Sequence, residues 1–160
     1  MKDKLIIVFS WALVAATMLI IFNFSAQPGK QSAEVSEGVI VQILDVFLEK
    51  EEITPPVVKK FQLPIRKIAH FGVYMLLGFC MISAFEKTFK IKLWINSVLS
   101  GVCCSIYAIS DEIHQNFSES RGPSVTDVLI DTGGAIIGIT LFLLVLHMFN
   151  RHQAKSRIQS

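Results

Sequence analysis

The amino-acid sequence predicts an all-α membrane protein, with four transmembrane helices and an amphipathic helix in the long first extracytoplasmic loop. Two observations predict this class. Of the 160 residues, 52% are hydrophobic and only 18% are charged, whereas soluble domains carry about 25% charged residues. The apolar residues also gather in long runs, and a helix of about 20 apolar residues spans the hydrocarbon core of a bilayer.

The first span is predicted at residues 5–24, directly after Lys2 and Lys4. Its apolar run is longer than the roughly 7–15 residues of a signal-peptide core, and no small-x-small cleavage motif follows it, so we expect a retained helix. Pro64 is expected to open the second span, because proline is well tolerated at the first helical position. The remaining spans are predicted at about 65–85, 93–114 and 124–150.

The connection between the first two spans is long and polar. Apolar residues recur in it at helical spacing between Val35 and Phe47, which predicts an amphipathic helix at about 33–50, lying at the membrane interface. We expect residues 1–150 to form a single transmembrane domain. Residues 151–160 are then a basic cytoplasmic tail, expected to be frayed.

The distribution of lysine and arginine predicts the orientation in the membrane, because short cytoplasmic loops are enriched in both. The short connection between the third and fourth spans has one such residue, Arg121. The opposite side carries Lys2, Lys4, Lys87, Lys90, Lys92, Arg151, Lys155 and Arg157. The long first loop also contains basic residues, which weakens the asymmetry. We therefore expect both termini to be cytoplasmic and the polar hairpin around Asp111–Arg121 to face outward.

Several polar residues lie within or beside the predicted spans, where each charge costs about 2.5–3.5 kcal/mol on insertion scales and so tends to be functional. They are Lys67, His70 and Tyr74 in the second span, Asp111, Glu112 and Gln115 in the third, Arg121 in the loop, and Asp127 and Asp131 in the fourth. All are expected at the outer end of their helices. A shared polar cavity is the simplest explanation of this common level.

Some of these residues also have simpler explanations. Ser124 and Asp127 match a capping box, so Asp127 could serve the start of the fourth helix. Asp131 lies one turn deeper, where capping does not explain it, and it is expected to have a basic partner. Lys67 is also compatible with an interfacial lysine, and Arg121 with a structural ion pair. Further along the fourth span, Gly134-x-x-x-Gly138 predicts close helix approach.

Three groups of residues together resemble the VanZ-like family of bacterial membrane proteins. They are Arg66-Lys67-x-x-His70-x-x-x-Tyr74, Asp111-Glu112-x-x-Gln115, and Arg121-x-x-Ser124-x-x-Asp127-x-x-x-Asp131-x-x-Gly134-x-x-x-Gly138. The segment Ser25-Ala-Gln-Pro-Gly-Lys-Gln-Ser32 is also similar to a stretch in that family. The resemblance implies a multi-pass protein of the bacterial cytoplasmic membrane, with a link to resistance against teicoplanin-type glycopeptide antibiotics. Asp131 departs from the family pattern, which more often has Asn at this position.

Three functions are compatible with the polar residues. In the first, a non-catalytic envelope protein binds a lipid head group, a cell-wall precursor or a glycopeptide-type ligand in an outward-facing cavity. In the second, a membrane-embedded enzyme acts on a lipid-linked substrate, with His70 and Asp111 or Glu112 as an acid–base pair or as ligands of a divalent metal. In the third, the polar network only assembles helices or an oligomer.

The sequence favours the first of these functions. It has no recognised nucleophile motif and no strong metal-ligand spacing, so we expect no metal and no other cofactor. The net charge is only +2 and no basic patch with interleaved aromatic residues is present, so nucleic acid is not an expected partner. Membrane lipids are the expected partners.

Overall fold

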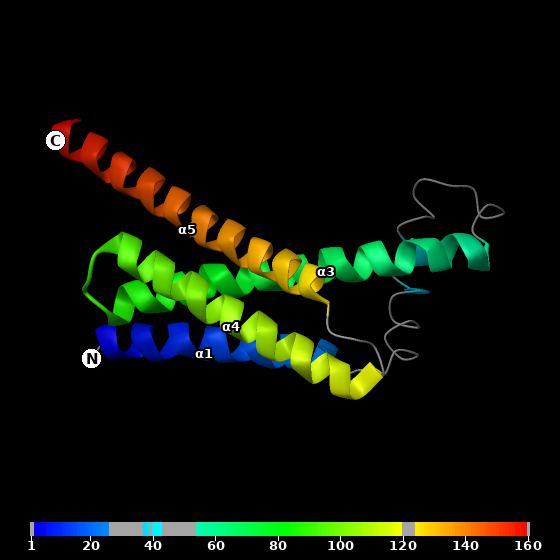
Figure 1. Cartoon of the computed structure of the whole chain (residues 1–160). Helices are drawn as coiled ribbons and strands as arrows, with labels where there is room; N and C mark the ends of the chain where they lie inside the picture. The colour runs from blue at the N-terminus through cyan, green and yellow to red at the C-terminus, as the bar shows by residue number, and fades with distance from the viewer. Residues whose placement is uncertain (1, 26–36, 39, 43–53, 120–123, 160) are drawn as a thin grey trace.

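The computed structural model describes residues 2–25, 37–38, 40–42, 54–119 and 124–159. In this part of the chain the long helices are α1 (Lys2–Ser25), α3 (Pro55–Thr88), α4 (Leu93–Glu119) and α5 (Val125–Gln159), shown in Figure 1. Each contains a stretch that is long and apolar enough to cross a membrane, which confirms the predicted class. The amphipathic helix expected at 33–50 lies largely outside the described residues.

Helix α3 is longer than the sequence pattern predicts. It begins at Pro55, and Pro64 lies inside it, so the prediction that Pro64 opens the span is wrong. Pro55 and Pro56 occupy the first turn, where a missing N–H costs nothing because that group has no intrahelical acceptor. At Pro64 the missing N–H leaves the carbonyl of Lys60 without its usual intrahelical donor. Helix α3 nevertheless continues on both sides of Pro64.

The last helix also continues beyond its predicted end. Helix α5 extends to Gln159, so most of the segment expected to be a frayed tail is helical. Arg151 and Lys155 lie in its last turns. Basic side chains are favourable there because the C-terminal end of a helix carries partial negative charge.

Helix α3 is the central element, because its contacts with α1, α4 and α5 are together the most extensive of any helix. The buried core consists mainly of its apolar face with smaller contributions from the other helices: Tyr74, Leu77, Met81, Ala84 and Phe85 with Val14, Ile21, Cys104, Ala108 and Ala135. Figure 1 shows both chain termini at one end of the bundle. The end of α1, the end of α4 and the start of α5 lie at the other end.

Helices α3 and α5 meet backbone to backbone. A Cβ atom built on Gly134 would overlap the carbonyl oxygen of Phe71, and one built on Gly138 would overlap that of Met75. In the reverse sense, a Cβ on Gly78 of α3 would overlap the carbonyl oxygen of Ala135. The Gly134-x-x-x-Gly138 step therefore allows the close helix approach that its spacing predicts. Gly78 of α3 takes part in the same contact.

A small polar network joins the helices near the termini. The Trp11 indole N–H donates to the Thr88 hydroxyl over 2.9 Å, and the Lys87 ammonium donates to the Ser10 hydroxyl over 3.0 Å. Both bonds connect α1 to the end of α3. Asn96 of α4, which is fully buried, donates to the carboxylate of Glu86. This end is thus held by hydrogen bonds between helices.

We expect Gly138→Ala to lower the free energy of unfolding by roughly 1–3 kcal/mol, the usual cost of overpacking, because the new methyl group must push the two backbones apart. Thermal unfolding of the detergent-purified protein measures this change. Gly72→Ala is the matched control, since a Cβ at Gly72 has no atom within 4 Å. Equal unfolding temperatures for the two variants would contradict the close contact.

Candidate functional site

The predicted polar residues that the structure describes lie at the end of the bundle remote from the termini. Lys67, His70 and Tyr74 share one face of α3, and each lies near an acidic side chain of α4 or α5. Together with Ser25 of α1, these side chains and their neighbours on α4 and α5 form a polar cluster between the helices. Its members are Ser25, Lys67, His70, Tyr74, Asp111, Gln115, Asp127 and Asp131. Arg121 lies outside the described residues, so its proposed role as the basic residue of the loop stays a prediction.

The more exposed part of the cluster is an ion pair between α3 and α5. Lys67 Nζ lies 2.6 Å from Asp127 Oδ1, and the two side chains are 38% and 25% exposed. This carboxylate oxygen makes no hydrogen bond of ordinary angular geometry with the described residues. The contact is therefore a charge pair at the rim of the cluster, where solvent or another anion can reach the ammonium group.

The start of α5 explains why Asp127 is available for this pair. The Ser124 hydroxyl accepts a hydrogen bond from the Asp127 N–H over 3.3 Å, which is one half of a capping box. The other half is supplied by a different helix, because Glu112 of α4 accepts from the Ser124 N–H over 2.6 Å. Glu112 thus caps α5, and the side chain of Asp127 pairs with Lys67.

Asp111 is held by hydrogen bonds from two neutral side chains. Its Oδ2 atom accepts from the Ser25 hydroxyl over 2.8 Å and from the Gln115 amide over 3.2 Å. Gln115 also donates to the Ser25 hydroxyl over 3.0 Å, which closes a triangle between α1 and α4. The spacing of Asp111 and Gln115 predicts that they share a face, but helical spacing does not assign Ser25 to the site. Its position directly after the first apolar run, at the outer end of that span, could have indicated it.

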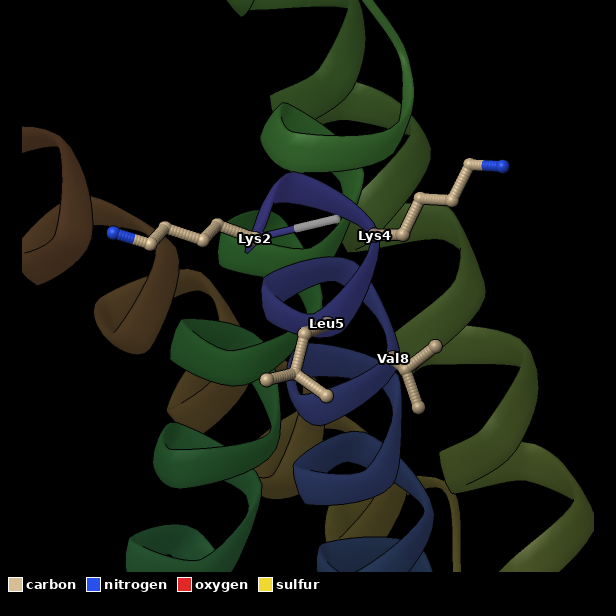
Figure 2. Close-up of a pocket in the computed structure, with 4 residues that line it drawn as sticks. All are labelled: Lys2, Lys4, Leu5 and Val8. Carbon is tan, nitrogen blue, oxygen red and sulfur yellow. The ribbon is translucent and has the colours of Figure 1, made fainter.

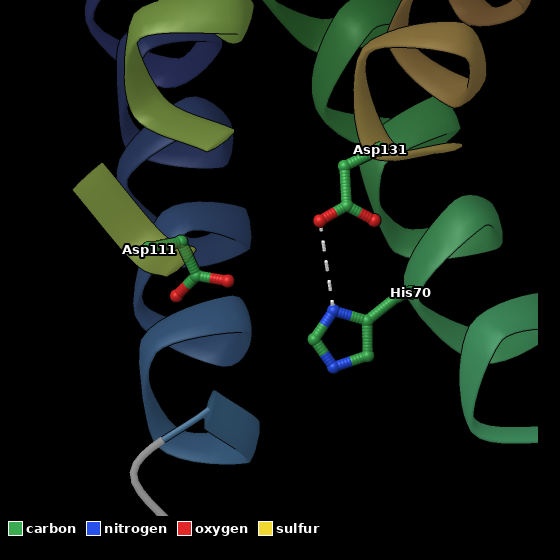
Figure 3. Close-up of side chains that lie close together, drawn as sticks. All are labelled: His70, Asp111 and Asp131. Atoms are coloured by element: carbon green, nitrogen blue, oxygen red, sulfur yellow. Dashed lines mark ion pairs between the residues drawn. The ribbon is translucent and has the colours of Figure 1, made fainter. Parts of the chain in front are cut away.

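The buried part of the cluster is formed by His70, Asp111 and Asp131, which come from three different helices (Figure 3). Asp111 and Asp131 are only 4% and 5% exposed. His70 Nδ1 lies 3.9 Å from Asp131 Oδ2, which is too long for a direct hydrogen bond. Figure 3 shows the imidazole and both carboxylates pointing toward one another. Asp131 therefore has the basic neighbour that its depth in the helix leads us to expect.

Tyr74 completes the buried part. It is fully buried, and its hydroxyl makes no hydrogen bond of ordinary geometry with the described residues. The hydroxyl lies close enough to Asp111 and Asp131 to interact electrostatically with both, and Asp111 is within hydrogen-bonding reach. A buried hydroxyl without a well-formed hydrogen bond costs roughly 1–3 kcal/mol, so Tyr74 is a polar group that the described residues leave incompletely satisfied.

A surface hollow of about 430 Å³ lies at the other end of the bundle, lined by Lys2, Lys4, Leu5 and Val8. Figure 2 shows the two lysine side chains extending in different directions from the first turn of α1. Leu5 and Val8 are exposed, as expected for side chains that face lipid. Lysines around an apolar surface are typical of a membrane interface. The hollow is separate from the polar cluster.

The cluster combines three chemical capacities. Lys67 offers an accessible positive charge to an anion, and the carboxylates can accept hydrogen bonds from hydroxyl groups. His70 beside Asp131 can hold or transfer a proton. One imidazole and two carboxylates can also coordinate a cation.

Comparison with known proteins gives one match. The model of the VanZ/LLP1 family matches residues 9–146, which include all four membrane-length helices in whole or in large part and every residue of the polar cluster. No curated protein and no solved structure shows significant similarity to the chain.

We expect Ser25→Ala to lower the free energy of unfolding by about 1–3 kcal/mol, because it leaves buried Asp111 with one hydrogen bond fewer. Chemical or thermal unfolding in detergent measures the change. Ser97→Ala is the control, since the Ser97 hydroxyl is exposed and bonds only a carbonyl of its own helix; its effect should stay within about 0.5 kcal/mol. Similar losses for both variants would contradict a role of Ser25 in joining α1 to α4.

A double-mutant cycle with Lys67→Met and Asp127→Asn should give a coupling free energy of about 0.2–1 kcal/mol, the range for partly exposed ion pairs. Unfolding measurements on the four proteins of the cycle provide this value. The control cycle combines Asp127→Asn with Lys90→Met at the opposite end of the bundle, where we expect no coupling. A zero coupling in both cycles would show that the rim pair adds no stability.

Proposed function

The chain belongs to the VanZ/LLP1 family and is a multi-pass membrane protein, and from this premise we propose that its polar cluster binds the head group of a membrane lipid or of a lipid-linked cell-wall precursor. The observation that carries the proposal is the common level of the charged side chains. Three membrane-length helices contribute Lys67, His70, Asp111, Asp127 and Asp131 to one end of the bundle. Charges within such helices tend to mark binding sites or pathways for polar groups.

The gradient of exposure within the cluster suits an amphiphilic ligand. The ammonium group of Lys67 is an accessible cation at the rim, and its partner Asp127 can be exchanged for a phosphate at little cost because the pair is partly exposed. Asp111 and Asp131 lie deeper, where carboxylates can accept hydrogen bonds from sugar or glycerol hydroxyls. The acyl or prenyl chain of the ligand stays in the bilayer.

The orientation proposed from the basic residues puts this site on the outer face of the cytoplasmic membrane, opposite the termini. Lipid-linked cell-wall precursors and externally added glycopeptides are both present on that face. A contribution to teicoplanin-type resistance would then follow from binding the antibiotic or the precursor that the antibiotic recognises.

The approach of His70 to Asp131 favours a second candidate, a membrane-embedded enzyme that acts on the same class of lipid-linked substrate. A histidine beside a carboxylate can serve as a general acid or base. In this case the ligand would be converted and not merely retained. Product analysis after incubation with the precursor separates the two candidates.

Native mass spectrometry of the purified protein tests head-group binding. We expect retention of phosphatidylglycerol or of an undecaprenyl-diphosphate-linked disaccharide, but not of phosphatidylcholine, whose head group has no net charge. Lys67→Met should weaken retention at least about tenfold, since a hydrogen bond to a charged group contributes roughly 1.5–3 kcal/mol.

Lys90→Met is the matched control, because it removes a lysine at the opposite end of the bundle and should leave retention unchanged. Retention of teicoplanin in place of both lipids would move the proposal to the glycopeptide. Equal retention by the parent protein and a folded Lys67→Met variant would reject the proposed site. If Lys67→Met lowers the amount of folded protein but each molecule still retains the lipid, the cluster serves helix assembly and not binding.

A further inference from the structure

We propose that His70, Asp111 and Asp131 form a binding site for one divalent transition-metal ion. No short sequence motif indicates such a site, because each ligand comes from a different helix. The three side chains are separated by 41 and 20 residues along the chain, yet one potential ligand atom of each lies within 4.8 Å of the others. This inference goes beyond head-group binding and does not depend on it.

The separations between the ligand atoms suit a common central ion. Nitrogen and carboxylate oxygen bind Zn²⁺ at roughly 2.0–2.2 Å in a tetrahedral arrangement, so two ligand atoms of one ion lie about 3.3–3.6 Å apart. The 3.9 Å between His70 Nδ1 and Asp131 Oδ2 is close to this separation, although it is too long for a hydrogen bond. The outer limit of 4.8 Å for the whole group requires side-chain rotations that bring the ligand atoms closer by about 1 Å.

The charge of the cluster supports a cation at this position. Asp111 and Asp131 are both at least 95% buried, and the hydrogen bonds that hold Asp111 come from the neutral Ser25 and Gln115. His70 adds at most one positive charge to these two carboxylates. Two ionised carboxylates packed together in a membrane protein repel each other and have lost much of their hydration. A divalent ion would balance both charges.

Tyr74 supplies an independent observation. Its fully buried hydroxyl makes no hydrogen bond of ordinary geometry with the described residues, although it lies within reach of Asp111 and interacts electrostatically with both carboxylates. An oxygen ligand or water on the ion would give this hydroxyl a partner. The Ser25 and Gln115 side chains also fit the proposal, because the carboxylate ligands of metal sites are usually held by further hydrogen bonds.

The ligand set indicates which ions the site would prefer. One imidazole nitrogen with two carboxylate oxygens suits Zn²⁺, Mn²⁺ or Fe²⁺, whereas Mg²⁺ favours oxygen ligands in a near-ideal octahedron. Three protein ligands leave at least one coordination position open, which is typical of catalytic rather than structural zinc sites. A phosphate oxygen of a head group bound at Lys67 could occupy that position.

Metal binding can be measured on the full-length protein in detergent without added lipid, so failure of the head-group proposal leaves this test unaffected. After chelator treatment and dialysis, the protein is titrated with Zn²⁺, Mn²⁺ and Mg²⁺ by calorimetry, and its metal content is measured by mass spectrometry. We expect one equivalent of Zn²⁺ or Mn²⁺ and much weaker binding of Mg²⁺. Co²⁺ should give a visible d–d absorption spectrum that reports coordination by nitrogen and oxygen.

Substitution of the ligands identifies the site. Asp131→Asn and His70→Gln keep the approximate size and polarity of the side chains, and each should weaken binding at least about 100-fold, since even substitutions around metal ligands cost about 10–100-fold. His147→Gln is the matched control, because it removes an exposed imidazole of α5 that lies 16 residues beyond Asp131, toward the opposite end of the bundle. It should bind the ion like the parent protein.

Two results would overturn the metal site. One is the absence of stoichiometric Zn²⁺, Mn²⁺ and Co²⁺ binding by the folded parent protein. The other is unchanged binding by folded Asp131→Asn and His70→Gln variants. If either variant fails to fold, the Co²⁺ spectrum of an Asp111→Asn protein decides, because loss of an oxygen ligand must alter the absorption bands.

Discussion

The close contact between α3 and α5 determines how the rest of the molecule is arranged. Gly134 and Gly138 allow the backbone of α5 to touch that of α3 at Phe71 and Met75, and this contact fixes the register of the two helices. His70 precedes Phe71 by one residue, and Asp131 precedes Gly134 by three. Because a glycine contact tolerates no sliding, the approach of His70 to Asp131 follows from it, as does the pairing of Lys67 with Asp127 one turn further out.

The polar cluster thus has two parts with different surroundings. At the rim, Lys67 and Asp127 are partly exposed and form a pair that contributes little stability. Inside, Asp111 and Asp131 are buried beside His70 and Tyr74. Burial strengthens every electrostatic interaction, so the inner part sets what the site can hold, while the rim decides which polar group can approach it.

The sequence predicts the helices, the shared end of the polar residues and the glycine contact, because hydropathy and helical period determine which segments span and which residues share a face. Period and spacing do not determine how the faces of neighbouring helices are rotated relative to one another. The place of Glu112 in the polar site stays a prediction, and the structure adds a contact that spacing does not reveal, the hydrogen bond that Glu112 accepts from the Ser124 N–H of α5. Helical spacing cannot connect Ser25 with Asp111, because the two residues are 86 positions apart. Local propensity favours proline at the start of a helix and does not predict Pro64 inside α3.

The interacting residues of the cluster also follow an order along the chain. For the three aspartates the polar partner from another helix precedes the carboxylate: Ser25 precedes Asp111, Lys67 precedes Asp127, and His70 precedes Asp131. Glu112, which is less buried, precedes its partner Ser124. Synthesis proceeds from the N-terminus, so the partner of each of the three aspartates emerges from the ribosome before the acidic residue that needs it. The order of the sequence thus suits stepwise assembly in the bilayer, in which no buried carboxylate must wait for a helix that has not yet been made.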